Sequence, residues 1–469
     1  MTKANPANCL TEYYRCPAEL VRHEPTYAPD GRKGYFRFGS AATCYGVLSN
    51  AEPAQSPEEC LCDTLEQVKI EAGKLCLSFN PAEIVDNLRS EQYANVTQAD
   101  SSTLMAALYY LIRPLLSVGV RKHLQRFRLK GWEKLPFPGW PIDHSVENLL
   151  EQLMLLELRA SGAKKLPFIW FWPEGHSSCV IMTHDVETAK GRDFCSGLMD
   201  IDDSFQIKAS FQVVPEKRYE VTLEFLESIR RRGFEVVIHD LNHDGRLYKN
   251  REQFLERAAK INAYGKLYKA EGFRAAVLYR NQQWYDELKF SYDMSIPNVA
   301  RLDPQRGGCC TVMPYFIGNL LEIPVTMVQD YTLFNILNRY SIDLWQEQIE
   351  KVMGKHGLMS FIVHPDVVIG AKEQKVFEAL MLYLSKIRSD RGAWITTPGE
   401  VNRWWRQRSS MTLAARRDGW EIEGQGKERA QIAYMTEQGG HLVFTHSEQS
   451  SAGARPPEVG EEYAAHSRR

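Results

Sequence analysis

Cysteine is scarce in this chain: ten of 469 residues, too few for a disulfide scaffold. No apolar run reaches the roughly 18 to 20 residues that span a bilayer. The longest candidate, LMAALYYLIRPLL, is interrupted by Arg113 and Pro114. The first twenty residues also lack the continuous apolar stretch of a secretory signal. These absences predict a cytoplasmic protein with reduced thiols and no transmembrane segment.

An excess of one charge is also missing, because 57 basic residues face 59 acidic ones and leave a formal net charge of -2. A global basic field that would bind nucleic acid or an anionic membrane is thereby excluded. No glycine-rich nucleotide motif stands at a strand-to-helix turn, and no internal repeat is present. What remains is an average globular composition, 44% hydrophobic and 25% charged, which is apolar enough to bury a sizeable core.

Residues 1–165 form a mixed, partly helical N-terminal region whose role the sequence does not reveal. Residues 34–47 indicate short strands with turns between them. Three helices are expected. The first covers 79–94, with Asn80 as N-cap and Pro81 just inside; the second covers 103–112; the third covers 144–162 and ends at Gly162.

From residue 166 to 408, short β-rich runs alternate with helical ones. Such alternation is typical of parallel strands covered by helices. Seven or eight units in about 240 residues favour an irregular (β/α)7-type barrel over an open sheet. The chain then becomes polar, and residues 409–446 indicate a small β appendage, followed by a disordered tail over 447–469. The predicted strands of the barrel segment cover 178–184, 207–214, 234–239, 274–279, 321–326, 358–364 and 393–397.

Polar side chains accumulate where three of these strands end, the rim at which barrels of this type carry their reacting groups. One strand ends in Thr183-His184-Asp185-Val186-Glu187, another in the segment 239–245, HDLNHDG, and a later one in His364-Pro365-Asp366.

His239 and His243 are four residues apart. On a helical turn this spacing places both imidazoles on one side, as two ligands of a divalent metal. A carboxylate would complete the ligand set, and Asp185 and Glu187 are both candidates by strand order.

The segments THDVE, HDLNHDG, GFRAAVLYRN, YDMS and FIVHPD occur in an order that resembles the polysaccharide deacetylase family, also called the NodB-homology or carbohydrate esterase family four. The resemblance covers about residues 168–400. It implies an irregular seven-stranded (β/α) barrel that removes acetyl groups from sugars with a divalent metal, usually zinc.

The resemblance also implies roles for individual residues. Asp185 matches the catalytic base. Glu187 takes the acidic metal-ligand position of branches that read D-V-E, and His239 and His243 match the other two metal ligands. The reverse division of roles between Asp185 and Glu187 stays open. Arg274 matches an arginine that keeps the base ionised, Asp293 the acid that orients this arginine, and His364 the general acid. The chain departs from the family pattern at three motif positions, Val186, Asp240 and Ala276.

The implied reaction is metal-assisted hydrolysis of an acetyl amide on a sugar or glycan precursor. Two alternatives remain at this stage. The first is hydrolysis of a small non-sugar amide on the same barrel, which the lack of an export signal keeps open. The second is a non-catalytic glycan-binding or regulatory protein that kept the pocket.

Other noticeable residues have plainer interpretations. His184 neighbours Asp185 and could line the pocket. Cys60, Cys62 and Cys76 suggest structural thiols rather than a metal knuckle, because a fourth ligand is missing. The adjacent Trp404 and Trp405 are expected to pack a helix against the barrel.

Overall fold

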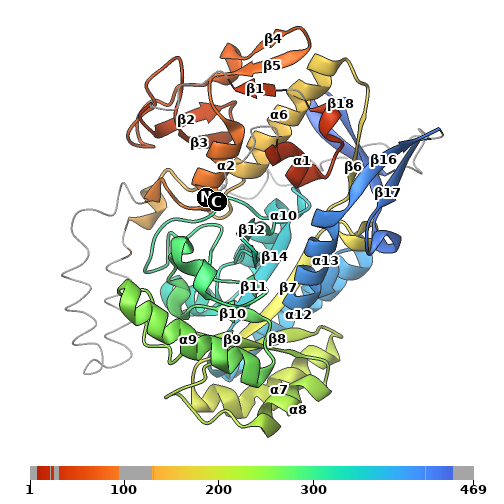
Figure 1. The fold of residues 1–469 in the computed structure, drawn as a ribbon. Coiled ribbons are helices and arrows are strands. Elements are labelled where there is room, and N and C mark those ends of the chain that lie inside the picture. Colours follow the sequence, from red (N-terminus) through yellow and green to blue (C-terminus); the bar gives the residue numbers. More distant parts are fainter. Residues whose placement is uncertain are drawn as a thin grey trace, which may run out of the picture.

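The computed structural model describes residues 8–21, 23–25, 31–94, 129, 131–417 and 419–446. The predicted helix at 103–112 and the tail at 447–469 lie outside these ranges. Within them, no helix is both long enough and apolar enough to cross a membrane. Figure 1 shows the N-terminal elements packed above a larger unit built around one parallel sheet.

The main sheet has nine strands and confirms the predicted α/β class with a barrel-like arrangement. Its order is β12-β13-β11-β10-β9-β8-β7-β14, with β15 also paired to β7. All pairings are parallel except that between β12 and β13. The strands are β7 (Cys179–Val186), β8 (Ala209–Val213), β9 (Glu235–His239), β10 (Gly272–Arg274), β11 (Tyr292–Asp293), β12 (Tyr315–Ile317), β13 (Leu320–Glu322), β14 (Leu358–Val363) and β15 (Trp394–Thr396).

The two ends of the sheet are bridged irregularly. Met327 donates its backbone N–H to the carbonyl of Ser360 at 3.2 Å, and the Thr326 hydroxyl donates to the carbonyl of Leu358 at 2.7 Å. The segment after β13 therefore lies against β14. A second irregularity lies at β7, where β15 pairs with residues 179–181 and β8 pairs with residues 182–186.

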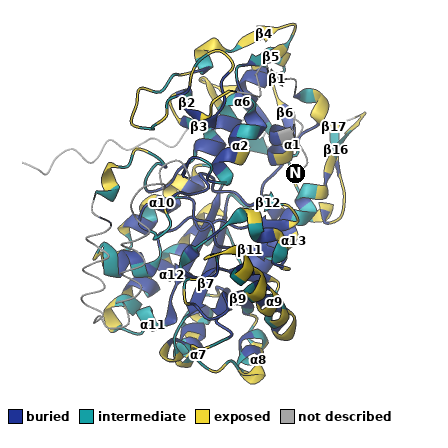
Figure 2. Ribbon diagram, turned by 60° about the vertical axis from the view of Figure 1, so that its left-hand side comes forward, coloured by how far each residue is buried: buried dark blue, intermediate teal, exposed yellow. Residues whose placement is uncertain are grey.

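Helices cover the outside of the sheet, so β7 and β14 are buried along their whole length and exposed residues lie on the outer helix faces (Figure 2). A buried phenylalanine or leucine side chain on such a face contributes roughly 1.5 to 3 kcal/mol. These helices are α7 (Ala189–Ser204), α8 (Leu223–Arg231), α9 (Arg251–Tyr268), α10 (Asp343–Met353), α11 (Pro365–Val368), α12 (Ala371–Arg391) and α13 (Pro398–Ser410).

The expected strand at 274–279 is wrong beyond its first residue. Strand β10 ends at Arg274, and residues 276–278 form a 3-10 turn in which Val277 and Leu278 have positive φ angles of 60° and 53°. The apolar run AAVL resembles a buried strand in composition, but it turns at the rim of the sheet instead.

The N-terminal region follows its local signals closely. Asn80 accepts hydrogen bonds from the N–H groups of Ala82 and Glu83, and Gly162 ends its helix with φ 65°. Its elements are α1 (Asn8–Tyr14), β1 (His23–Pro25), β2 (Gly34–Phe38), β3 (Ala42–Gly46), β4 (Lys69–Glu71), β5 (Lys74–Leu77), α2 (Pro81–Arg89) and α6 (Ser145–Ser161).

Strand β6 (Leu166–Ile169) does not belong to the barrel, although the sequence places it at the start of the barrel segment. It pairs antiparallel with β18 (Ile432–Gln438), which in turn pairs with β19 (His441–His446). Strands β16 (Thr412–Arg416) and β17 (Gly419–Glu423) form a separate hairpin. The C-terminal strands therefore join the chain that links the N-terminal region to the barrel.

Helix α13 connects these parts. Trp404 and Trp405 are buried, as expected from the sequence. The guanidinium of Arg408 is also buried, and it donates to the backbone carbonyls of Tyr13, Tyr14, Ile169 and Trp170. One side chain thus fastens α1, the end of β6 and α13 together.

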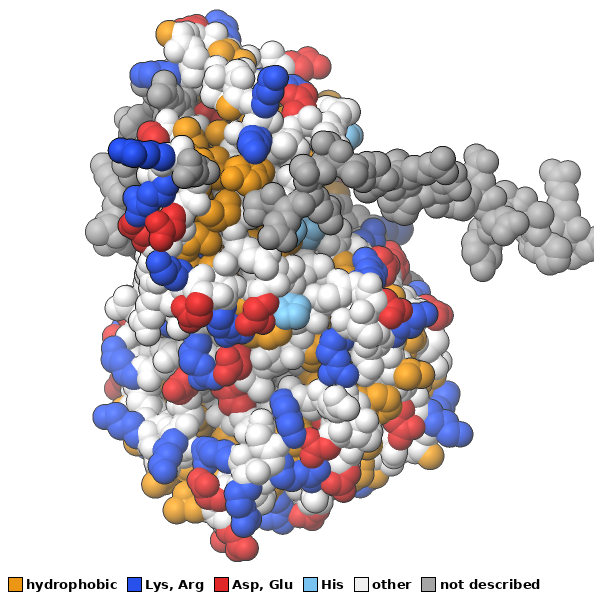
Figure 3. All heavy atoms as spheres, turned by 90° about the vertical axis from the view of Figure 1, so that its right-hand side faces the viewer, with side chains coloured by type: hydrophobic (Ala, Val, Ile, Leu, Met, Phe, Trp, Pro, Cys, Tyr) orange, Lys and Arg blue, Asp and Glu red, His pale blue; other side chains and the backbone are white. Residues whose placement is uncertain are grey.

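Charged side chains of both signs lie on the surface of the described residues. On the face drawn in Figure 3, basic and acidic side chains are interspersed over the lower part of the molecule. This distribution agrees with the near-zero net charge of the chain.

Candidate metal and hydrolytic site

The carboxyl ends of β7, β9 and β14 bring Asp185, Glu187, His239, His243 and His364 together. Within the described residues, two groups of three side chains could hold a metal ion: Glu187 with His239 and His243, and Asp185 with Glu187 and His364. The ligand atoms of each group lie within 4.8 Å of one another. Glu187 belongs to both groups and therefore lies at the centre of the cluster.

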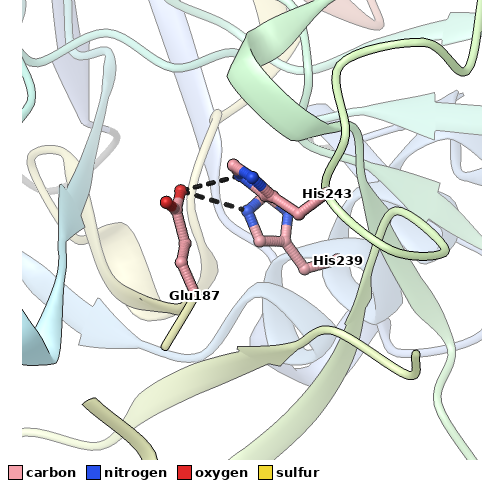
Figure 4. Close-up of side chains that lie close together, drawn as sticks. All are labelled: Glu187, His239 and His243. Atoms are coloured by element: carbon pink, nitrogen blue, oxygen red, sulfur yellow. Dashed lines mark ion pairs between the residues drawn. The ribbon is translucent and has the colours of Figure 1, made fainter. Parts of the chain in front are cut away.

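Glu187 faces the two imidazoles across the site (Figure 4). Its Oε1 lies 2.8 Å from Nε2 of His243 and 3.7 Å from Nε2 of His239. Both Nε2 atoms are buried, and neither is aligned for a hydrogen bond with any group. Two buried ring nitrogens that face one carboxylate oxygen are a donor set that fits a divalent metal ion.

The two histidines do not share a helical turn, so that part of the sequence interpretation is wrong. His239 is the last residue of β9, and its backbone is followed by a loop in which Asp240 and His243 have φ angles of 56° and 54°. This left-handed backbone, rather than helical periodicity, turns the two rings toward each other with centroids 4.8 Å apart.

Asp185 pairs with Arg274. Its Oδ1 accepts from Nη1 of Arg274 at 2.6 Å, and the same nitrogen donates to the Thr183 hydroxyl at 2.8 Å. Burial raises the pKa of Asp185, but the nearby Arg274 and His239 outweigh it and hold the pKa below its ordinary value. The free Oδ2 lies 3.6 Å from Nε2 of His239.

Asp293 does not orient Arg274, contrary to the expectation. Arg274 Nε donates instead to the backbone carbonyl of Met294 at 3.0 Å. Asp293 accepts from the backbone and the hydroxyl of Ser295, at 2.9 Å each, and lies beside the fully buried Glu322. Since the guanidinium already has a carboxylate partner in Asp185 and a carbonyl partner in Met294, it needs no second acid.

His364 is held by Asp330, a residue that the sequence did not single out. Asp330 Oδ1 lies 2.6 Å from Nδ1 of His364, and its Oδ2 accepts from the His364 backbone N–H at 2.8 Å. Burial disfavours the imidazolium, but Asp330 outweighs burial and raises the pKa of His364 well above its ordinary value. Nε2 of His364 lies 3.4 Å from Glu187 Oε1, inside the site.

Two further residues, Arg218 and Tyr219, were also missed. Both belong to the loop between β8 and α8. Arg218 donates to the His243 backbone carbonyl at 2.7 Å, and Tyr219 donates to the Val186 carbonyl at 2.7 Å. No motif marks them, and only the packing of this loop against the ends of β7 and β9 shows what they do.

His184 lies outside the site, so the idea that it lines the pocket is wrong. Successive residues of a strand point to opposite faces, and the neighbouring Asp185 points inward. The His184 ring packs against Phe211 and Phe377 and lies 3.0 Å from Asp202 Oδ2. It is a core histidine with satisfied partners.

No family model matches the chain, and no curated protein matches it. Among solved structures it is similar to a Mycobacterium smegmatis protein described as a polysaccharide deacetylase, at 18% identity and a TM-score of 0.41, covering 51% of this chain and 93% of that one. A Pseudomonas aeruginosa PAO1 protein described in the same way has 12% identity and a TM-score of 0.40, with 50% and 92% covered. Puue allantoinase has 13% identity and a TM-score of 0.39, with 50% and 92% covered.

Proposed function

We propose that the chain is a metal-dependent hydrolase that removes an acetyl or similar acyl group from the nitrogen of an amino sugar or glycan precursor. The observation that carries this proposal is the pair of buried Nε2 atoms of His239 and His243 that face the same carboxylate, Glu187. The motif resemblance supports acyl transfer from a sugar nitrogen as the chemistry of such a site.

Glu187, His239 and His243 would hold the ion, with zinc the metal that the resemblance implies. A divalent ion bound there would polarise the acyl carbonyl and lower the pKa of a water molecule toward about 7.

Asp185 is suited to act as the base because Arg274 keeps it ionised and its Oδ2 carries no hydrogen bond from Arg274. An ionised carboxylate beside the attacking water accepts the proton that the water loses.

His364 is suited to act as the acid. Asp330 engages Nδ1, so that Nε2 is the ring nitrogen facing the site. The raised pKa favours the protonated ring, and a protonated imidazole can deliver a proton to the departing amine. The amine is a poor leaving group unless it is protonated.

Metal analysis of the purified protein tests the proposal directly. The wild-type protein is expected to bind one divalent ion, and His239→Ala is expected to lose stoichiometric metal. His176→Ala is a matched control, because His176 lies away from the site and bonds to the Gly392 carbonyl. Equal metal content in His239→Ala and the wild type would contradict the assignment.

Acetate-release assays then define the substrate class. A panel of N-acetylated sugars is expected to be hydrolysed. If only small non-sugar amides are hydrolysed, the substrate class is a small amide and not an acetylated sugar. No turnover on either panel by the metal-loaded protein would favour a binding protein.

A further inference from the structure

Arg218 contacts His243 in a way that is unusual for the environment of a metal ligand. Its Nη2 donates to the backbone carbonyl of His243 at 2.7 Å and lies 3.0 Å from Nδ1 of the same ring. Among the described contacts, no carboxylate forms an ion pair with Arg218. The exposed side chain of Arg218 therefore makes its described hydrogen bonds to His243 alone.

The chemistry of the guanidinium fixes the state of the ring. Arginine has donors and no acceptor, so Nδ1 of His243 must accept the hydrogen bond. In the neutral ring the hydrogen then resides on Nε2, the nitrogen that faces Glu187 at 2.8 Å. A nitrogen that carries a hydrogen has no lone pair for a metal.

His239 shows the opposite arrangement. Its Nδ1 lies 3.1 Å from the backbone carbonyl of Arg274, which can only accept. The His239 hydrogen therefore resides on Nδ1 and leaves the Nε2 lone pair free. Metal-ligating histidines almost always donate their second ring N–H to an acceptor in this way, and this contact makes the ligating nitrogen more basic.

We propose that Arg218 is a positioning residue that opposes metal binding at His243, and that the guanidinium must leave Nδ1 before His243 can serve as a ligand. The inference rests on the proposed metal site. Without a metal, His239 then has a free lone pair on Nε2 and can bind the ion. His243 carries its hydrogen on Nε2 and cannot bind the ion through that nitrogen. Because the Arg218 side chain is exposed and has no ion pair to a described carboxylate, it can move into solvent.

The tautomer of His243 can be measured without any metal. In the chelator-treated protein with ¹⁵N-labelled histidine, the ring nitrogen shifts of His243, assigned with His243→Ala, are expected to show the hydrogen on Nε2. Arg218→Met is expected to move the hydrogen toward Nδ1. A wild-type His243 that carries its hydrogen on Nδ1 would overturn the inference.

Zinc affinity, measured by competition with a chromophoric chelator, is the second readout. Arg218→Met removes the competing donor, and Arg218→Gln also offers a carbonyl to Nδ1. Both are expected to bind zinc at least about tenfold more tightly than the wild type, because a hydrogen bond from a charged donor no longer holds the metal-free state. Arg388→Gln is the control, since Arg388 also donates to backbone carbonyls, those of Phe205 and Gln206.

The two proposals fail in different ways. A wild-type protein that binds no zinc through His239 would refute the metal site itself. A wild-type protein that binds zinc, with Arg218→Met and Arg218→Gln correctly folded by circular dichroism and equal to it or weaker in affinity, would refute only the role of Arg218.

Discussion

Asp185 and Glu187 are two residues apart, yet they have different partners. Arg274 pairs with one oxygen of Asp185, while Glu187 faces the Nε2 atoms of both His239 and His243. This difference favours Glu187 as ligand and Asp185 as base, the division that the motif resemblance implies. The assignment stays a prediction, because His239 Nε2 lies within 3.7 Å of both carboxylates.

Asp185→Asn separates the two roles. The amide cannot accept the proton of water, so kcat on an acetylated sugar is expected to fall at least about 100-fold. Metal content, measured by elemental analysis, should stay near the wild-type value, and Glu187→Gln should lose metal. Loss of metal in Asp185→Asn together with its retention in Glu187→Gln would reverse the two roles.

His364→Ala tests the general acid. Loss of the proton donor is expected to lower kcat on an amide at least about 100-fold with metal retained. An acetate ester with a good leaving group should lose much less, because its alkoxide or phenoxide departs without full protonation. Asp330→Asn should show a smaller loss of the same kind, since the ring keeps its position and loses the charge that raises its pKa. Equal losses on amide and ester would rule out the acid role.

At the scale of an element, the loop between β8 and α8 connects two strand ends that carry site residues. The Tyr219 hydroxyl donates to the Val186 carbonyl at 2.7 Å and accepts from the Val214 N–H at 3.0 Å. Since Val186 directly precedes Glu187, this hydroxyl holds the backbone next to Glu187, the proposed metal ligand.

Tyr219→Phe removes the hydroxyl and leaves two buried backbone groups unpaired. The free energy of unfolding is expected to fall by about 1 to 3 kcal/mol, and metal affinity should weaken as Glu187 loses its support. Denaturant unfolding and metal titration measure the two effects. Tyr264→Phe is a suitable control, because its hydroxyl bonds only to the side chain of Glu216 among the described contacts. Unchanged stability and metal affinity in Tyr219→Phe would show that the hydroxyl supports neither.

The buried pair at the ends of β11 and β13 predicts a pH effect on stability. Burial raises the pKa of Asp293 to about 6 and that of Glu322 well above its ordinary value. The folded state thus retains protons that the unfolded state releases above its own carboxyl pKa of about 4. The contribution of Asp293 is fully present below about pH 4 and is lost as pH rises through about 6, and that of Glu322 is lost as pH rises through its own raised pKa.

Glu322→Gln removes one of the two carboxyl groups that bind a proton more tightly in the folded state than in the unfolded state. Between pH 4.5 and 7.5 the variant is expected to gain stability relative to the wild type, as measured by urea midpoints at both pH values. A stability difference that does not change with pH would contradict this account.

Local signals and long-range contacts differ in how well the sequence revealed them. The cap at Asn80 and the helix end at Gly162 depend on neighbouring residues, so they could be predicted, and strand-helix alternation predicted the barrel. Asp330 lies 34 positions before His364, and β6 pairs with a strand more than 250 residues later. No periodic pattern in the sequence indicates such contacts. The left-handed backbone at Asp240 and His243 could not be predicted from the sequence either.

At the scale of the whole molecule, the N-terminal region is joined to the barrel rim by a buried ion pair. Glu91 Oε2 accepts from Nε of Arg280 at 2.6 Å, and Oε1 accepts from the Gly308 N–H at 2.6 Å. Glu91 and Arg280 are 7% and 4% exposed, so solvent screens their interaction little. The N-terminal region therefore contacts two loops of the barrel segment through Glu91.

Glu91→Gln leaves Arg280 buried without its counter-charge and is expected to lower the free energy of unfolding by roughly 3 to 5 kcal/mol. Denaturant unfolding measures the loss. The double variant with Arg280→Met should recover much of it, because no lone charge remains. Recovery is the decisive result: a double variant as unstable as the sum of the two single variants would show that the pair is not coupled.

The hydrogen bonds from Arg408 to four backbone carbonyls also affect the order in which parts of the chain can fold during synthesis. Arg408 bonds to Tyr13 and Tyr14 across sequence separations of 395 and 394 residues. A ribosome adds about 5 to 20 residues per second, so Arg408 is synthesised roughly 20 to 80 s after the two tyrosines whose carbonyls it binds. During that interval α1 cannot complete its native contacts with α13. The contacts between the first described helix and the last turn of α13 are therefore among those that form late in synthesis.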